Sequence, residues 1–289
     1  GEEHPNTAAS YNNLAGVYVK KGKYREAEEL FEKALRISKE ILGEEHPSTA
    51  ASYNNLAGVY KRQGRYKEAE ELYGKALRVR KLVLGEEHLS TATGYNNLAG
   101  VYVEQGRYEE AEKLYEKALR IGKEVLGEEH PSIAASYNNL ARVYKRKGKY
   151  REAEGLYGNA LRISEKILGE KHPSTATSYN NLAGVYVEQG RYEEAEKLYE
   201  KALRIDKEIL GERHPSTATG YNNLACMYEH QEKYREAEKL YGKTLRIWKE
   251  VLGEEHPDTQ DVYKTLESLY YKRNPNGGFD QWLAEKMKD

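Results

Sequence analysis

The sequence contains a single cysteine, Cys226, among 289 residues. One cysteine cannot form an internal disulfide or a cysteine-based zinc site, and its rarity favours a reducing compartment. No Asn-x-Ser/Thr sequon is present, which agrees with that location. No apolar run approaches the roughly 20 residues that a membrane span needs, and no signal-peptide pattern opens the chain. We therefore expect a cytoplasmic protein that does not bind membranes.

Neither sign of charge dominates the sequence. It has 46 Lys and Arg against 47 Asp and Glu, a net charge of −1, which argues against a nucleic-acid partner. With 38% hydrophobic and 32% charged residues, the chain is polar for a single globular domain with a large core. Balanced charge and 10% aromatic residues argue equally against disorder. The first residue is Gly1 rather than Met, which predicts a fragment of a longer protein.

The aromatic residues are almost all tyrosines, with 26 Tyr against 2 Phe and 2 Trp. Such a bias indicates an internal repeat. A glycine recurs every 42 residues, at positions 1, 43, 85, 127, 169, 211 and 253. We predict six full repeats followed by a partial seventh repeat with a C-terminal capping helix. Their bounds are 1–42, 43–84, 85–126, 127–168, 169–210, 211–252 and 253–289.

Each repeat contains two helical patterns, which we call helix A and helix B. In the first repeat, apolar residues at i, i+3 and i+4 mark helix A, and Gly22 ends it. Pro5 stands where helix A begins, and Gly43 follows helix B where a positive φ is needed. The expected packing residues are Ala8, Tyr11, Leu14, Ala15 and Tyr18 in helix A, and Tyr24, Ala27, Leu30, Phe31, Ala34, Leu35 and Ile41 in helix B.

Small residues recur where the two helices should cross. In the first repeat these are Ala15, Ala27 and Ala34, and the pattern repeats every 42 residues until Thr244 replaces the last alanine. The hydroxyl of Thr244 needs a hydrogen-bond partner. Because one helix pair cannot bury its apolar face alone, the pairs must stack into a solenoid. The sequence therefore predicts an all-α fold of antiparallel helix hairpins.

The repeat resembles the tetratricopeptide repeat (TPR). The residues that carry this resemblance are Tyr11, Leu14, Ala15, Tyr18, Gly22, Tyr24, Ala27, Phe31 and Ala34. The 42-residue length, the Asn-Asn-Leu-Ala run in helix A and the Leu-Gly-x-x-His-Pro connector are similar to kinesin light chain repeats. The resemblance implies a right-handed superhelix with helix A lining a concave groove that binds a partner's peptide. It also implies cargo-adaptor-like recognition of short, acidic, aromatic-containing motifs.

Two consecutive asparagines in helix A are unusual, because asparagine is a mediocre helix former. Their carboxamides could pair with a peptide backbone, and the resemblance favours this role for the second asparagine. The alternative is that the asparagines hydrogen-bond between adjacent repeats. The predicted peptide-binding asparagines are Asn13, Asn55, Asn97, Asn139, Asn181 and Asn223. A clamp for two carboxylates would need a lysine near the start of helix A, where Ala9 stands, so that clamp is not expected.

Positive charges concentrate near the C-terminal end of helix A in repeats 2 and 4. The residues are Lys61, Arg62, Arg142, Lys145 and Arg146. We expect an acidic peptide to bind across repeats 2–4, with the asparagines fixing its backbone. The alternative is a solvated charged face without a ligand.

No catalytic motif, phosphate-binding loop or metal motif is present, so we expect no enzyme, no cofactor and no metal. Seven of the eight histidines occupy the connectors, one per repeat, which indicates structural packing rather than convergence on a metal. Cys226 lacks a catalytic context and is expected in the groove or buried. Even repeats carry a glycine inside helix B, at Gly74, Gly158 and Gly242. A recent duplication of a repeat pair explains this alternation, and a partner surface on helix B is the alternative.

The two ends of the chain differ. Residues 259–289 are expected to cap the solenoid, with a short last helix around Asp280–Met287 that carries Trp282 and Leu283. No comparable cap precedes Gly1, so end-to-end self-association is plausible. The predicted function is a non-enzymatic scaffold that binds a protein or peptide partner. The alternative function is a structural, self-associating array that uses its uncapped end or its convex face.

Overall fold

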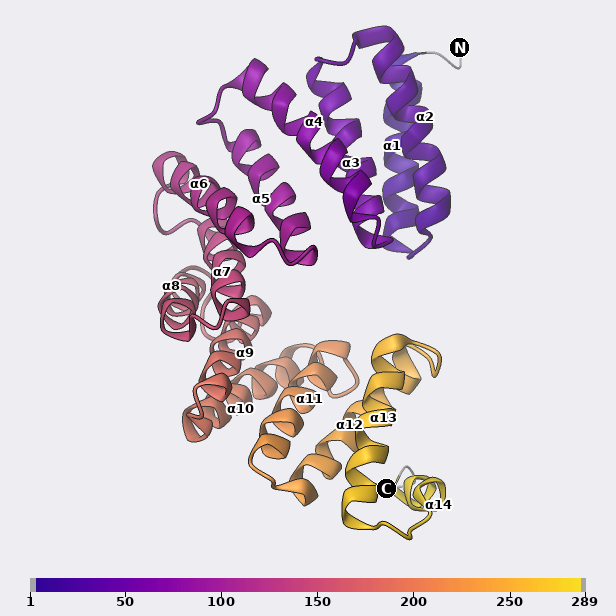
Figure 1. The fold of residues 1–289 in the computed structure, drawn as a ribbon, viewed down its shortest axis with the longest axis vertical. Coiled ribbons are helices and arrows are strands. Elements are labelled where there is room, and N and C mark those ends of the chain that lie inside the picture. The colour runs from indigo at the N-terminus through magenta and orange to yellow at the C-terminus, as the bar shows by residue number, and fades with distance from the viewer. Residues whose placement is uncertain (1–3, 287–289) are drawn as a thin grey trace. The chain divides into compact units, whose positions relative to one another are not determined.

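The computed structural model describes residues 4–286, which form fourteen α-helices and no strand (Figure 1). The chain divides into two compact units, residues 1–147 and 148–289. Unit 1 contains α1 (Pro5–Lys20), α2 (Tyr24–Leu42), α3 (Pro47–Arg62), α4 (Tyr66–Leu84), α5 (Leu89–Glu104), α6 (Tyr108–Leu126) and α7 (Pro131–Arg146). Unit 2 contains α8 (Tyr150–Leu168), α9 (Pro173–Glu188), α10 (Tyr192–Ile209), α11 (Pro215–His230), α12 (Tyr234–Val251), α13 (Pro257–Arg273) and α14 (Phe279–Lys286).

The connector histidines cap the N-termini of the odd-numbered helices α1–α13. In α3, Nδ1 of His46 accepts a hydrogen bond from the backbone N–H of Ser48 at 3.1 Å. This bond satisfies one of the free N–H groups that every helix leaves at its start. The histidines with this role are His4, His46, His88, His130, His172, His214 and His256. The expected structural role of the connector histidines is therefore helix capping.

Glycines with positive φ separate the helices, as the sequence predicts. Gly43 after α2 has a φ of 86°, and Gly22 between α1 and α2 has a φ of 72°. Each lies in the backbone region that residues with a Cβ avoid. In the sixth repeat, the position of Gly22 is occupied by Glu232, which has a φ of 58°.

We expect Glu232→Gly to stabilise the protein. A residue with a Cβ in the left-handed region carries a steric cost of about 1–2 kcal/mol. Glycine removes this cost but raises the conformational entropy of the unfolded chain, which offsets part of the gain. The net gain should be about 0.5–1 kcal/mol, measured as a shift of the urea unfolding midpoint. The same change at exposed Lys233, whose φ is negative, is the control and should not stabilise.

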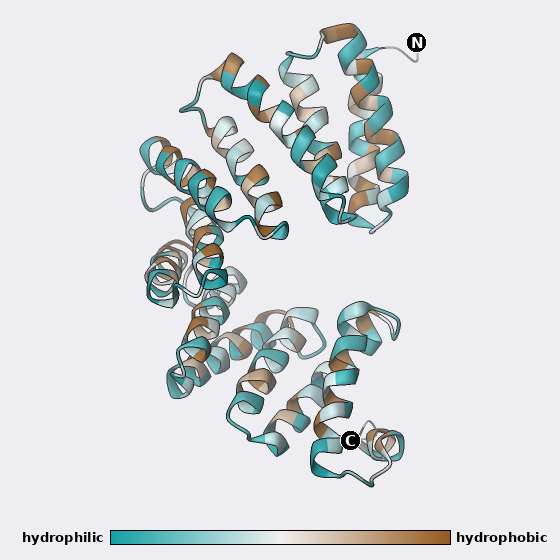
Figure 2. Ribbon diagram, viewed as in Figure 1, coloured by the Kyte–Doolittle hydropathy of each residue, from teal (hydrophilic) through white to brown (hydrophobic). Residues whose placement is uncertain are grey.

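Within each unit, consecutive helices pack as antiparallel hairpins, and each new helix A packs on the preceding helix B. The contacting pairs include α3 with α4 inside a hairpin and α4 with α5 between hairpins. Hydrophobic and hydrophilic residues alternate around the helices, so that one side of each can pack (Figure 2). The predicted crossing alanines are buried; Ala15, Ala27 and Ala34 are fully inaccessible. Thr244 is also buried, and its hydroxyl donates to the carbonyl of Ala218 at 3.2 Å. The predicted all-α solenoid of helix hairpins is confirmed.

Two expected packing residues of the first repeat are exposed instead. Leu14 on α1 is 47% exposed, whereas its equivalents in repeats 2–6 are buried against a preceding helix B. Among the described residues no helix packs on that side of α1. Ile41 is 43% exposed because the last turn of helix B extends beyond the helix A that it packs against. This position is exposed in all six repeats and forms what we call the connector stripe: Ile41, Val83, Val125, Ile167, Ile209 and Val251.

The helix-interior glycines of the even repeats are not required by packing. A Cβ placed on Gly74, Gly158 or Gly242 would meet no atom within 4 Å. None of the three has a positive φ, and glycine in a helix interior costs about 1 kcal/mol relative to alanine. Neither a positive φ nor a close approach of neighbouring atoms therefore explains why glycine stands at these three positions.

The C-terminal helices close unit 2. Phe279 and Leu283 on α14 are buried against α13, where the Phe279 ring lies 5.4 Å from the ring of Tyr263 and 5.6 Å from that of Tyr270. Trp282 stacks on Phe279 with ring centroids 5.7 Å apart. The sequence predicts a short helix here, and α14 lies one residue from its expected start. Its expected last residue, Met287, lies outside the described residues.

Candidate peptide-binding face

The asparagine pairs lie on the helix A layer, which we call the A-face. Adjacent A helices contact each other directly, as α1 with α3 and α9 with α11. Among the predicted asparagines, Asn13 is exposed and the other five are half-buried. In four of the pairs the side-chain oxygen of the first asparagine is buried without a hydrogen-bond partner: Asn12, Asn96, Asn138 and Asn180. In these pairs the second asparagine has no such buried oxygen, so its carboxamide is the one that remains open to a ligand.

One contact joins the two asparagine positions across a repeat boundary. Nδ2 of Asn97 on α5 donates to Oδ1 of Asn54 on α3 at 2.8 Å. This is the inter-repeat hydrogen bond that the sequence leaves open as an alternative. It occupies one donor of Asn97, and a carboxamide has a second donor and two acceptor lone pairs in reserve. An inter-repeat bond and a ligand contact are thus compatible at the same residue.

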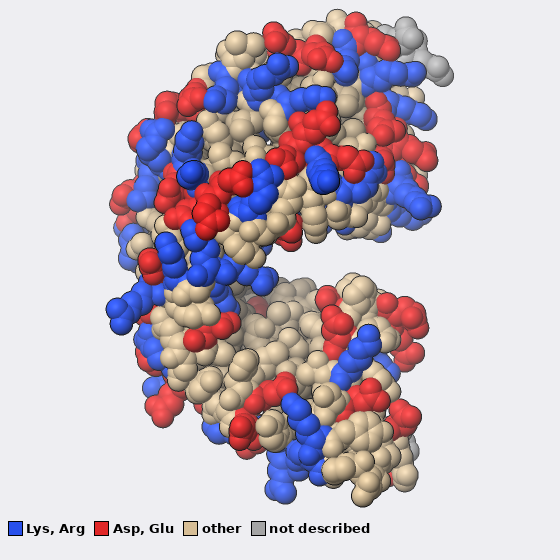
Figure 3. Space-filling model, viewed as in Figure 1, with Lys and Arg blue, Asp and Glu red and all other residues tan. Residues whose placement is uncertain are grey.

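The predicted basic residues all lie in unit 1, at the C-terminal turns of α3 and α7 or one turn earlier. Arg62, Arg142 and Arg146 are exposed, and Lys61 and Lys145 are half-buried. Figure 3 shows Lys and Arg side chains gathered around α7. Lys61 crosses toward α5, where its Nζ lies 2.7 Å from the position that a Cβ on Gly100 would take. The glycine at this repeat position therefore makes room for the ammonium group.

Burial lowers the pKa of Lys61 below its ordinary value of 10.5. The carboxylate of Glu104 opposes this shift, while the charges of Arg142 and Arg62 reinforce it. Lys61 and Arg142 thus repel each other electrostatically although they belong to different repeats. Lys61 has no ion pair within 4.0 Å among residues 4–286. A desolvated ammonium beside other positive charges favours an incoming anion.

The remaining predicted residues are not part of this cluster. Asn13 lies on α1, at the far end of unit 1, and Asn181 and Asn223 lie in unit 2 on α9 and α11. Cys226 on α11 is half-buried, and its Sγ accepts a hydrogen bond from the hydroxyl of Tyr241 at 3.1 Å. Burial raises the pKa of the Cys226 thiol, so it stays protonated near neutral pH and is a poor nucleophile.

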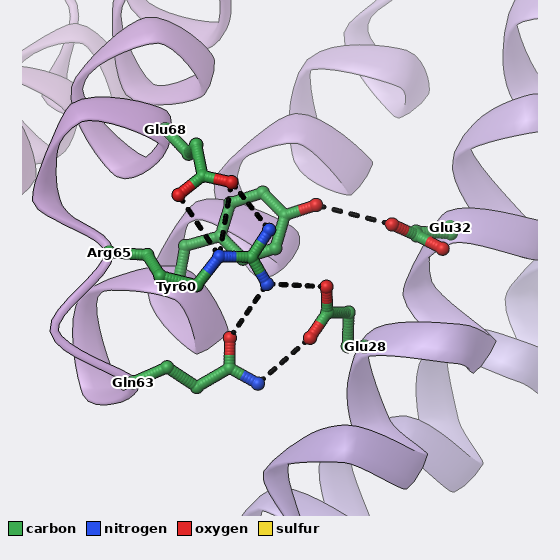
Figure 4. Close-up of polar contacts among 6 residues, drawn as sticks. All are labelled: Glu28, Glu32, Tyr60, Gln63, Arg65 and Glu68. Carbon is green, nitrogen blue, oxygen red and sulfur yellow. Dashed lines mark hydrogen bonds and ion pairs between the residues drawn. The ribbon is translucent and has the colours of Figure 1, made fainter.

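A second set of polar residues, absent from the sequence-based site, joins each helix B to the next repeat (Figure 4). Glu28 on α2 accepts from Nη1 of Arg65 at 2.6 Å and from Nε2 of Gln63 at 2.8 Å. Arg65 also binds Glu68 and lies over the ring of Tyr60, with its Cζ 3.9 Å from the centroid. We call this arrangement the polar clamp, because it ties one helix B to the next turn between helices A and B.

The polar clamp recurs along the chain. Glu70 binds Gln105 and Arg107, with Arg107 over Tyr102 at 3.9 Å, and Glu154 binds Gln189 and Arg191 in the same way. In the fourth repeat Lys147 stands at the position of the glutamine and its Nζ lies 2.5 Å from the carboxylate of Glu112. The 42-residue recurrence of Glu28 as Glu70, Glu112, Glu154, Glu196 and Glu238 is visible in the sequence. Its partner lies about 37 residues away, so only the stacking of repeats reveals the contact.

We expect protonation of the polar clamp to lower the stability of the protein at acidic pH. Burial raises the pKa of Glu70, but hydrogen bonds from Arg107 and Gln105 outweigh it and hold the pKa below the ordinary 4.5; Glu154 behaves alike. A carboxylate whose pKa is lower in the folded than in the unfolded state stabilises the fold fully at a pH above the unfolded-state pKa. This contribution is lost as the pH falls through the folded-state pKa. The urea midpoint should therefore fall steeply below about pH 4.5.

The double variant Arg107→Gln with Arg191→Gln should flatten this acid dependence, because both carboxylates return toward their ordinary pKa. Exposed Arg78, which has no ion pair in the described part of the chain, supplies the control Arg78→Gln. An equally steep acid transition in the double variant would show that other carboxylates govern it.

Comparison with known proteins agrees with this architecture. The tetratricopeptide repeat profile matches residues 6–82, 48–123, 90–166, 133–208, 176–250 and 216–274. A crystal structure from Podosopora anserina, described as a kinesin light chain with nearly identical TPR-like repeats, is 35% identical over 71% of this chain and 97% of its own, with a TM-score of 0.62. BtubC (BKLC) from P. vanneervenii is 27% identical over 78% of this chain and 89% of its own, with a TM-score of 0.62. The search of curated proteins gave no match.

The chain belongs to the tetratricopeptide repeat family, whose repeats generally mediate protein–protein interactions. The family assignment and the kinesin light chain-like character of the repeats agree with the sequence prediction. Within residues 4–286, no helix is long and apolar enough to cross a membrane. The same residues contain no group of three or more His, Cys, Asp or Glu side chains placed to hold a metal ion.

Proposed function

We propose that this chain is a non-enzymatic, cytoplasmic interaction scaffold that binds an acidic peptide of a partner protein on the A-face of repeats 2–4. The observation that carries the proposal is the half-buried ammonium group of Lys61, which lies against Gly100 of α5 and within the electrostatic influence of Arg142. Lys61 is desolvated, lacks an ion pair among the described residues and has a lowered pKa. A carboxylate that reached it would gain a strong charge-assisted contact and remove the repulsion between the two cations.

The asparagines complete this proposed site. Asn55 on α3 and Asn139 on α7 precede the basic residues of their own helices by one or two helical turns, and Asn97 lies on α5, the helix A of the repeat between them. Their half-buried carboxamides can hydrogen-bond the backbone of an extended peptide, which gives affinity without a sequence requirement. The basic residues would then select acidic side chains. The similarity to a structure described as a kinesin light chain supports a peptide-binding role.

A peptide-display selection tests this proposal. Random peptides are selected against the wild-type chain and against the triple variant Asn97→Ala, Asn139→Ala and Asn181→Ala. We expect the wild type alone to enrich an acidic motif. If both proteins enrich the same peptides, or if neither enriches any, then the A-face asparagines serve the repeat junctions and do not bind a ligand.

A second candidate function is self-association, and the connector stripe favours it. Six β-branched side chains, one per repeat, are 43–54% exposed at the ends of the B helices. Exposed apolar side chains form interfaces where they make a contiguous patch, and Leu14 and Val17 add exposed apolar area on α1. Light scattering across a range of concentrations separates the candidates. A mass that grows with concentration and returns to the monomer in Val83→Lys with Val125→Lys would favour self-association.

A further inference from the structure

A pocket lies in unit 2 between α12, α13 and α14, away from the A-face asparagines. It has a volume of about 520 Å³, within the usual range of ligand sites. Leu266 of α13 and Trp282 and Leu283 of α14 supply its apolar walls. We call it the C-terminal pocket, because α14 is the last described helix (Figure 1).

The rim of the C-terminal pocket is strongly basic. Helix α12 contributes Arg235, Lys239, Lys243 and Arg246. Arg235 and Lys239 have no ion pair among the described residues, and Nζ of Lys243 lies 4.8 Å from the ring centroid of Tyr221. Glu238, the only carboxylate among the described residues that line the pocket, is paired with Arg273 at 2.5 Å. Arg235 and Lys239 therefore give the rim positive charge that no ion pair among the described residues offsets.

Glu238 adds a requirement for a hydrogen-bond donor. Its side chain is only 10% exposed, and although Oε2 binds Arg273, Oε1 is buried without a hydrogen-bond partner. A buried acceptor without a donor is costly. Sulfate brings no donor and the hydrogen phosphate dianion only one O–H, whereas a peptide backbone brings a neutral N–H group with every residue. The charge and the vacant acceptor together point to a peptide.

Gly242 opens the space. It lies in the interior of α12, lines the C-terminal pocket and would direct a Cβ at no atom within 4 Å. Glycine here destabilises the helix relative to alanine, and no close packing requires it. A side chain at this position would occupy the C-terminal pocket. Gly158 has the same repeat position and the same open surroundings on α8, but it does not line this pocket.

We infer that the C-terminal pocket is a second peptide site, which takes an acidic segment carrying a large apolar side chain. The apolar side chain packs against Trp282 and Leu266, the acidic residues face the α12 cations, and a backbone N–H reaches Oε1 of Glu238. This site is independent of the A-face, so one chain can hold two acidic segments at once.

The test uses the hexapeptide Glu-Glu-Leu-Phe-Glu-Glu and the fluorescence of Trp282. Since Trp248 is the second tryptophan and is buried, the measurement uses a Trp248→Phe background so that Trp282 alone reports. We expect saturable quenching, and at least about tenfold weaker binding for Gly242→Leu and for Arg235→Glu with Lys239→Glu. The matched variant Gly158→Leu should give the same Trp282 titration as the background protein. Circular dichroism confirms that each variant is folded.

Control probes decide what occupies the pocket. Glu-Glu-Ser-Ser-Glu-Glu should bind at least about tenfold more weakly, because it lacks the apolar anchor, and Lys-Lys-Leu-Phe-Lys-Lys should not bind. Quenching by inorganic phosphate as strong as by the peptide would assign the pocket to small anions and overturn the inference. A Trp282 signal that changes with protein concentration alone would assign it to a second copy of the chain. Unchanged peptide affinity in folded Gly242→Leu would also overturn it.

Discussion

Reversing two charges on α7, Arg142→Glu with Lys145→Glu, is expected to weaken acidic-peptide binding by about 30- to 100-fold. Arg142 is exposed and Lys145 half-buried on the same helix. Arg142 also acts electrostatically on Lys61, 81 residues earlier in the chain. The reversal removes two favourable charges and places two like charges against the peptide, so both effects lower affinity. The measurement is a fluorescence-anisotropy titration with the acidic peptide enriched by the wild type.

Three comparisons make this result specific. The single variant Arg78→Glu changes an exposed arginine on α4 away from the A-face and should leave affinity unchanged. Added salt should weaken wild-type binding, because exposed charges are screened over about 10 Å at 0.1 M. Peptide binding should also raise the pKa of Lys61 back toward 10.5. NMR of the methylated Lys61 amine as a function of pH measures this change. Equal affinity in the double variant and the wild type would rule out this site.

Replacing a crossing alanine by leucine, Ala99→Leu, is expected to destabilise the protein by about 1–3 kcal/mol. Ala99 on α5 is fully inaccessible, in the tight contact between α5 and α6. Three additional carbon atoms there must push the two helices apart or adopt strained rotamers. Since each repeat is stabilised by its neighbours, the loss also weakens the adjoining junctions. The urea unfolding midpoint measures the effect.

The control is the same substitution at an exposed position of the neighbouring helix A. Ala51 on α3 is exposed, so Ala51→Leu should stay within about 0.5 kcal/mol of the wild type. If Ala99→Leu is equally mild, the crossing has spare volume and the small side chain at this position has another origin. Because both variants add the same atoms to a helix A, their difference isolates the effect of packing.

The sequence alone determines the helices and most of the core. Period 3.6 in the apolar residues, Pro5 at a helix start and Gly43 at a helix end are local signals, and the 42-residue recurrence repeats them. The crossing alanines could be predicted because a small residue at a fixed place in every hairpin has a simple steric reason. The connector histidines could be assigned a structural role, although not their specific one as helix caps.

Tertiary structure decides whatever depends on the neighbouring repeat. Leu14 and Leu56 have the same local pattern, but only Leu56 is buried, because only α3 has a preceding helix B in the described chain. The polar clamp joins Glu28 to Arg65, and no local rule relates residues at that separation. Burial, reinforced by the charge of Arg142 on α7, lowers the pKa of Lys61, and the C-terminal pocket exists because α14 leaves space beside Gly242. Periodicity thus fixes each hairpin, while stacking brings distant side chains together and decides which surfaces remain free for a partner.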